Sequence, residues 1–163
     1  MAPVPFRRQL PRRRGVAALC HRTDAGELTV GGVTTSELVA TYGTPVMVLD
    51  RDHVVAEARE LKAAFDAEFA RIGTTAKIYY AGKAFLCTEI ARWVTAEGLG
   101  IDVCSGGELA VALAADVDPA RIGYHGNNKS VPEIGRAVSV GVGTIVLDSE
   151  IEIGRVAAAA AAH

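Results

Sequence analysis

A regular alternation of strand-like and helix-like segments from residue 76 onward most constrains the fold of this chain. Apolar segments typical of strands begin near residues 76, 100, 121 and 144, which lie 24, 21 and 23 residues apart. Helical patterns come after them at residues 86–97, 107–115, 131–140 and from 150 onward. Successive βα units build a parallel sheet with right-handed crossovers. The sequence therefore predicts an α/β fold with four parallel strands in this part.

Two α/β folds fit this alternation, a doubly wound sheet and a (β/α)8 barrel. A doubly wound sheet usually carries a glycine-rich nucleotide turn after its first strand. Here that turn reads Ala81-Gly-Lys-Ala84, with neither Gly-x-Gly-x-x-Gly nor Walker spacing. A complete barrel of eight units needs about 250 residues, whereas this chain has 163. We therefore expect an incomplete TIM-type barrel of about four βα units, in a chain that is a truncated piece of a longer protein.

The residues before the barrel carry weaker patterns. We expect a strand at residues 28–30, a helix at 35–42 closed by Gly43, and a strand at 46–49. A long helix comes next, with Asp52 as its N-cap and Gly73 at its end. Its apolar residues share one face and predict burial; they are Val54, Ala58, Leu61, Phe65, Phe69 and Ile72. A later helix begins with Ser130-Val-Pro-Glu133, the spacing of a capping box.

Charge divides the chain into two regions. Residues 1–23 contain six arginines and no acidic residue, which leaves the other 140 residues with 11 basic and 19 acidic groups, a net charge of −8. We expect residues 1–23 to be a disordered basic extension, 24–51 a separate N-terminal segment, and 52–163 the partial barrel. The acidic body argues against nucleic acid as a partner.

Apolar runs and cysteines limit the remaining classes. No apolar run approaches the roughly 18 residues of a membrane span, so we expect no membrane association. The three cysteines lack Cys-x-x-Cys spacing. Their pattern predicts neither a disulfide framework nor a metal site, and it favours a reducing compartment.

Polar residues come after each of the four predicted barrel strands. Barrel enzymes place their reactive groups at the carboxyl ends of the strands. Loops are polar in any case, so each residue also has a purely structural interpretation. The candidates are Lys83; Asp102, Cys104 and Ser105; His125, Asn127 and Asn128; and Asp148 and Ser149.

Lys83 is the candidate with the most specific chemistry. A lysine amine can lose its proton in a desolvated site and attack a carbonyl, which arginine cannot do. The alternative is a solvated lysine at the start of a βα loop. Asp102 could hold an ammonium, an imine or a cofactor hydroxyl, or it could satisfy loop amides. His125 could bind a ligand or its own loop, and Cys104 is typical of a packing residue.

Four sequence blocks carry a resemblance to a known family. They resemble the diaminopimelate decarboxylases, pyridoxal-phosphate enzymes of the alanine-racemase-like fold, in the expected order from about residue 28 to the end. The blocks are Tyr42-Gly-Thr-Pro-Val-Met-Val-Leu-Asp50, Tyr79-Tyr-Ala-Gly-Lys-Ala-Phe85, Asp102-Val-Cys-Ser-Gly-Gly-Glu-Leu109 and His125-Gly-Asn-Asn-Lys-Ser130.

This resemblance implies a function and a site. Lys83 would form an imine with pyridoxal 5'-phosphate, and Asp102 would lie near the cofactor. The reaction would be decarboxylation of meso-2,6-diaminopimelate to L-lysine and CO2 in a cytoplasmic homodimer, with a small amino acid as substrate. The family's C-terminal β domain, which residues 46–49 would normally join, is missing. We therefore expect the chain alone to be inactive and prone to aggregation.

Three other functional interpretations stay open on the sequence. The first is a decarboxylase of the same fold that acts on ornithine, arginine or a carboxylated polyamine. The second is a barrel that binds pyridoxal phosphate without catalysis, which would keep Lys83 but release no CO2. The third is a truncated product without function.

Overall fold

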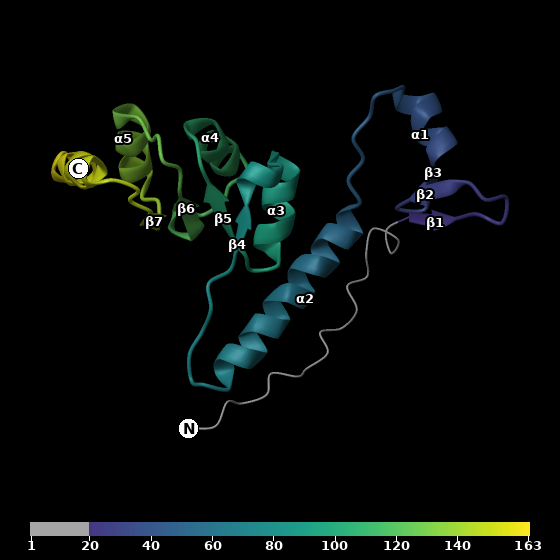
Figure 1. Ribbon diagram of the computed structural model, residues 1–163, viewed down its shortest axis with the longest axis horizontal. Helices are drawn as coiled ribbons and strands as arrows, with labels where there is room; N and C mark the ends of the chain where they lie inside the picture. Colours follow the sequence, from purple (N-terminus) through teal and green to yellow (C-terminus); the bar gives the residue numbers. More distant parts are fainter. Residues whose placement is uncertain (1–19) are drawn as a thin grey trace. The chain divides into compact units, whose positions relative to one another are not determined.

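The structure is a computed structural model of the chain, and it describes residues 20–163. The chain divides into two compact units, one up to His53 and one from Val54 to His163. Figure 1 gives the labels of the elements used from here on.

The first unit holds a small antiparallel sheet and one helix. Strands β1 (Cys20–Arg22), β2 (Leu28–Val30) and β3 (Val33–Thr34) pair in that order, and α1 (Thr35–Tyr42) comes directly after them. Thr34 begins α1 with a capping box, since its hydroxyl accepts from the Glu37 amide and the Glu37 carboxylate accepts from the Thr34 amide. Gly43, with φ of 73°, closes the helix. The predicted strand 28–30 and helix 35–42 are confirmed.

Two expectations for the N-terminal part are wrong. Residues 20–22, expected to be disordered, form β1, because backbone pairing with β2 satisfies their amides and carbonyls. The rest of the expected extension, residues 1–19, lies outside the described residues. The expected strand at 46–49 is not a strand, and Met47 there is 76% exposed. Within the described part of the first unit, no strand pairs with it.

Helix α2 (Arg51–Ala70) leads into the second unit, which repeats a strand and a helix four times. The parallel strands are β4 (Tyr79–Ala81), β5 (Gly100–Val103), β6 (Ile122–Tyr124) and β7 (Thr144–Ile145). The helices after these strands are the short η2 (Gly82–Ala84), α3 (Thr88–Ala96), α4 (Gly106–Ala114), the short η3 (Pro119–Arg121), α5 (Val131–Val140) and α6 (Glu150–Ala161).

The order of these strands decides between the two α/β folds. The sheet runs β4-β5-β6-β7, so each new strand adds on the same side of the previous one. A doubly wound sheet would reverse this order at a switch point. Figure 1 shows α3, α4 and α5 in the same order along the row of strands. The predicted barrel topology is confirmed for four βα units.

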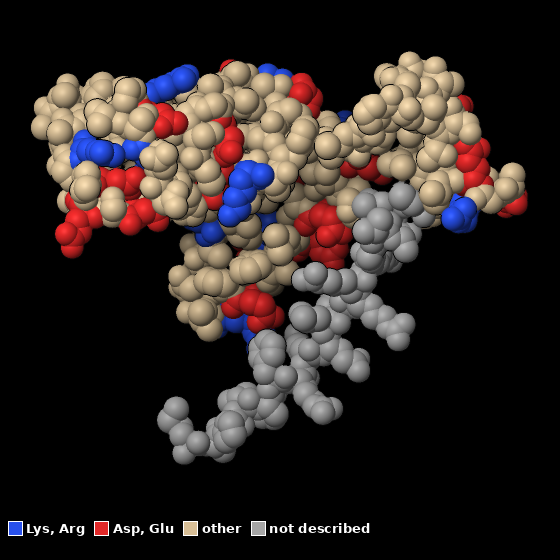
Figure 2. Space-filling view, turned by 45° about the horizontal axis from the view of Figure 1, so that its top comes forward, with Lys and Arg blue, Asp and Glu red and all other residues tan. Residues whose placement is uncertain are grey.

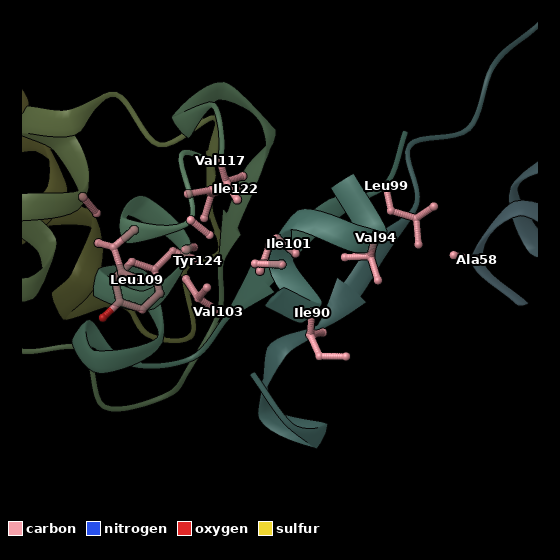
Figure 3. Close-up of a cluster of buried hydrophobic side chains, with 14 residues drawn as sticks. Ala58, Ile90, Val94, Leu99, Ile101, Val103, Leu109, Val117, Ile122 and Tyr124 are labelled. Atoms are coloured by element: carbon pink, nitrogen blue, oxygen red, sulfur yellow. The ribbon is translucent and has the colours of Figure 1, made fainter. Parts of the chain in front are cut away.

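The two faces of this sheet differ in chemistry. Ile101 and Val103 of β5 point to the helices, together with Ile122 and Tyr124 of β6, and all four are fully buried. Burying such a side chain contributes roughly 1.5–3 kcal/mol. Figure 3 shows them packed with helix residues such as Leu109. The alternate residues, including Asp102, face the opposite side, which is the inner side of a barrel.

Helix α2 corrects two local predictions. Asp50, not Asp52, caps it, because Asp50 Oδ1 accepts from the His53 amide at 3.2 Å. Its apolar face was expected to be buried, yet Leu61 is 47% and Phe65 42% exposed, and of the residues of α2 only Ala58 is buried. Within residues 54–163, the elements that pack on α2 cover Ala58 and leave most of this face in solvent.

The surface is mixed in charge. On the described surface that Figure 2 shows, acidic and basic side chains are interspersed among neutral residues, and no broad basic face is visible. Among residues 20–163, no helix is long and apolar enough to cross a membrane.

Candidate functional site

The carboxyl ends of β4, β5 and β6 bring three of the predicted residues to one rim of the sheet. The register pairs Ala81 with Asp102 and Asp102 with Gly123. Lys83 lies two residues after β4, and His125 comes directly after β6. Parallel strands in this register end at the same edge, so Lys83, Asp102 and His125 lie on one rim although they are spread over 42 positions of the chain.

Lys83 lies in the short helical turn η2 that leaves β4. Tyr80 closes this turn, because its hydroxyl donates to the carbonyl of Phe85 at 2.7 Å. Gly82 lets the turn lie against β5, since a Cβ there would be 2.9 Å from the backbone oxygen of Asp102. The Lys83 side chain is exposed. The desolvation expected to favour a neutral amine is therefore not supplied by residues 20–163.

Asp102 and His125 form the closest polar contact on the inner face. Asp102 Oδ1 lies 2.6 Å from Nδ1 of His125, and the aspartate side chain is only 14% exposed. That oxygen is buried, and the two atoms do not meet hydrogen-bond geometry. A buried carboxylate oxygen without a well-formed partner is costly in an apolar setting. The imidazole therefore covers Oδ1, and Asp102 and His125 together form the polar part of the inner face.

A hollow of about 360 Å³ opens in front of this pair. Gly123 lines the hollow beside Asp102, and a Cβ there would lie 3.6 Å from Asp102 Oδ1, an ordinary van der Waals contact. Lys83 is not among the residues that line the hollow, although it lies on the same rim. The lining comes from all four strands and from the loops at their carboxyl ends: Tyr79, Ala81, Asp102, Gly123, His125, Thr144 and Val146.

Two of the other predicted candidates, Cys104 and Ser105, belong to the start of α4. Burial raises the pKa of the Cys104 thiol, with Glu108 and Asp102 adding to the effect, so this cysteine is not an activated thiolate. The amides that open α4 are satisfied by protein carboxylates: Cys104 N donates to Glu108 and Gly106 N to Glu133, each at 2.7 Å. The segment 105–107 is the start of a helix, with Ser105 as its N-cap.

Charged residues that the sequence interpretation overlooked bind the rim loops together. Glu133 accepts from Ser130 and from Gly106, and these bonds lower its pKa to about 2, with the Ser130 bonds the larger cause. The hydroxyl of the fully buried Tyr124 lies beside this carboxylate, and burial raises the tyrosine's pKa. The sequence signal for such glutamates is a Ser-x-x-Glu spacing, which occurs at 105–108, 130–133 and 149–152. The capping box predicted from the sequence covers only the second of these.

Metal ligands do not cluster in the described part of the chain. Between residues 20 and 163, no group of three or more His, Cys, Asp or Glu side chains could hold a metal ion.

The family of the chain is evident from its match to known proteins. Residues 51–163 match the pyridoxal binding domain of the pyridoxal-dependent decarboxylases. This chain belongs to that family. The matched residues include Lys83, Asp102 and His125, and thus the whole rim described above.

Curated members of this decarboxylase family are similar over most of the chain. The diaminopimelate decarboxylase of Mycobacterium leprae is 52% identical over 139 residues, and that of Mycobacterium tuberculosis is 50% identical over 139 residues. The match covers 85% of this chain but 28% and 30% of those proteins. The chain thus spans less than a third of the length of these relatives.

Solved structures of the family share the fold. The diaminopimelate decarboxylase of M. jannaschii superposes with a TM-score of 0.80 at 25% identity, over 89% of this chain and 33% of that one. The same enzyme in complex with L-lysine gives a TM-score of 0.76 at 26% identity, over 88% and 33% of the two chains.

The residues on the rim suit the cofactor of this family, pyridoxal phosphate. The cofactor needs an amine for its aldehyde and charged or polar partners around its ring. Lys83 carries an amine on this rim, and Asp102 has a buried carboxylate oxygen that lacks a well-formed hydrogen bond. The hollow in front of Asp102 and His125 is open to a ligand.

Proposed function

We propose that this chain supplies the lysine-bearing part of a diaminopimelate decarboxylase, which converts meso-2,6-diaminopimelate to L-lysine and CO2. The observation that carries the proposal is the 50–52% identity to curated diaminopimelate decarboxylases over a segment that includes Lys83. The assignment to this substrate is supported by relatives of that name, one of which was solved with L-lysine bound.

Lys83 is the residue that we assign to covalent attachment of the cofactor. Its amine is the group that would hold the aldehyde of pyridoxal phosphate covalently, which requires the amine in its neutral form. Because Lys83 is exposed in this structure, the burial that favours a neutral amine would come from the cofactor and from protein beyond residues 20–163. When bound, the cofactor's pyridine ring accepts the electron pair left by the departing carboxylate.

Asp102 and His125 are the residues that we assign to orientation of the ligand. The buried carboxylate would accept a hydrogen bond or hold a positive group in the hollow, and His125 limits the directions from which that group can approach. Holding the breaking bond in the productive orientation can contribute several kcal/mol to catalysis. We further propose a cytoplasmic homodimer for the whole protein.

The test uses a chimaera, in which the 139 aligned residues of this chain replace their counterparts in the M. leprae relative. Borohydride reduction of the chimaera with pyridoxal phosphate fixes the imine, and peptide mapping locates it. We expect the label on Lys83, and release of lysine and CO2 from diaminopimelate. Lys83→Ala should abolish both.

Lys77→Arg is the matched control, because Lys77 precedes the same strand but lies at its other end. The control should keep the label and the activity. A label on another lysine would refute the role of Lys83. Labelling without CO2 release would favour a non-catalytic barrel, and release from ornithine or arginine instead of diaminopimelate would refute the assigned substrate.

A further inference from the structure

Lys129 is a buried charge that the proposed reaction does not use. Its side chain is 0% exposed, and its Nζ lies 3.0 Å from Glu152 Oε2 and 3.7 Å from Asp148 Oδ2. The same ammonium donates to the carbonyl of Gly126. A buried ammonium is tolerated only where such partners replace water. Both carboxylates belong to the next βα unit, so the lysine joins two neighbouring loops.

A short path connects this ammonium to the candidate site. Gly126 comes directly after His125, with φ of 102°, and a Cβ on it would lie 2.6 Å from the Cys104 carbonyl. The amide of His125 donates to Val103 at 2.8 Å. The loop is therefore packed tightly against the end of β5. Within it, Lys129 binds the carbonyl of Gly126, the residue that follows His125, and so anchors the loop one residue beyond the imidazole.

Glu152 accepts the same kind of hydrogen bond as two earlier glutamates on this rim, but its partner in the preceding βα unit is of a different kind. Each Ser-x-x-Glu glutamate accepts from an amide at the start of its own helix: Glu108 from Cys104, Glu133 from Ser130, and Glu152 from Asp148. Glu133 also accepts from an amide of the preceding unit, at Gly106. Glu152 reaches the preceding unit as well, and there its partner is the Lys129 ammonium.

We infer that Lys129 and Glu152 are a positioning pair, which fixes the 125–129 loop so that His125 stays against Asp102. The pair acts through the Gly126 carbonyl, and neither residue lines the hollow in front of Asp102. This inference rests on the proposed function, because it assigns the pair to the site that contains Asp102. The competing role is purely structural, in which the ion pair only stabilises the packing of α5 against α6.

Variants of the chimaera separate these two roles. Lys129→Met leaves Glu152 buried without its ammonium, so it should lower the melting temperature. Lys129→Met combined with Glu152→Gln removes the uncompensated charge, and its melting temperature should return toward that of the parent. Glu152→Gln alone keeps both Lys129 and Asp148 and should have the mildest effect. Lys62→Met removes a lysine paired with Asp66 on α2, away from the rim, and is the matched control.

The decisive readouts are the NMR signal of the His125 imidazole and the steady-state constants. In the double variant we expect a shifted His125 signal and a kcat/KM lowered roughly tenfold to a hundredfold, despite recovered stability. Lys62→Met should change neither. A double variant with the parent's His125 signal and kcat/KM would overturn the inference. Should the chimaera prove inactive, the proposed function fails, while the His125 signal still decides whether Lys129 positions that ring.

Discussion

Gly126 shows how one residue can limit the geometry of the rim. Its φ of 102° lies in a region that residues with a side chain rarely adopt, and its backbone approaches the carbonyl of Cys104. Position 126 therefore has two requirements, a positive φ and a close approach of its backbone to the Cys104 carbonyl. Both serve the loop that carries His125 to Asp102.

A substitution at this position should therefore be costly. We expect Gly126→Ala to destabilise the fold by roughly 1–3 kcal/mol, because the added methyl group brings both backbone strain and a clash. The free energy of unfolding in urea measures this in the chimaera. Gly135→Ala is the matched control: Gly135 lies in α5 with no atom within 4 Å of its would-be Cβ, so alanine should be neutral or stabilising. Equal effects of the two substitutions would contradict the prediction.

For Lys83, the sequence predicts the position of the residue but not its exposure to solvent. Its place after an apolar strand and its amine chemistry could be read from the sequence. Its exposure could not, because exposure depends on which other segments cover the rim. The sequence does not decide the role of His125 for the same reason. A histidine in a polar loop indicates a site only when its distance to Asp102 is known.

Among the elements, the starts of the helices are the features that neighbouring residues predict most directly. The Ser-x-x-Glu spacing predicts that α5 begins at a capping box, and Ser130 and Glu133 form it. The second bond of Glu133, to Gly106 in the preceding unit, has no local signature because it spans 27 residues. The same glutamate thus fixes both its own helix and the neighbouring loop.

The depressed pKa of Glu133 predicts an acid-dependent stability. Since its pKa falls from an ordinary value of 4.5 to about 2 on folding, the carboxylate stabilises the fold above pH 4.5. This contribution should be lost as the pH falls from 4.5 toward 2. We expect Glu133→Gln to be less stable than the parent at neutral pH and to lose less stability over that window.

Urea midpoints of the chimaera between pH 2 and 6 measure this dependence. Glu150→Gln, which changes an exposed glutamate in the first turn of α6, provides the comparison, and its pH dependence should match the parent's. A parallel pH dependence for Glu133→Gln and the parent would show that Glu133 is not the group responsible.

For the whole molecule, the open sheet and the apolar face of α2 determine how the chain behaves alone. Within residues 20–163, β4 and β7 each pair on one side only. Unpaired strand edges and exposed apolar surface both favour association. Leu61, Phe65 and Ile72, from α2 and the turn after it, contribute to that surface.

We therefore expect residues 1–163 alone to self-associate and to release no lysine from diaminopimelate in the presence of pyridoxal phosphate. Light scattering after size-exclusion chromatography and an assay for lysine test the two parts. The chimaera serves as the positive control for both. A monodisperse chain with cooperative unfolding and lysine release would contradict this prediction.

The sequence by itself determined the alternation of strands and helices after residue 76 and the position of Lys83 at the end of the first of these strands. These depend on local periodicity, turn residues and capping, all of which act within a few residues. Only the tertiary structure decided that Asp102 meets His125, that Lys129 is buried between two units, and that the apolar face of α2 stays exposed. Such contacts join residues far apart in the chain, and they exist only once the strands lie in register.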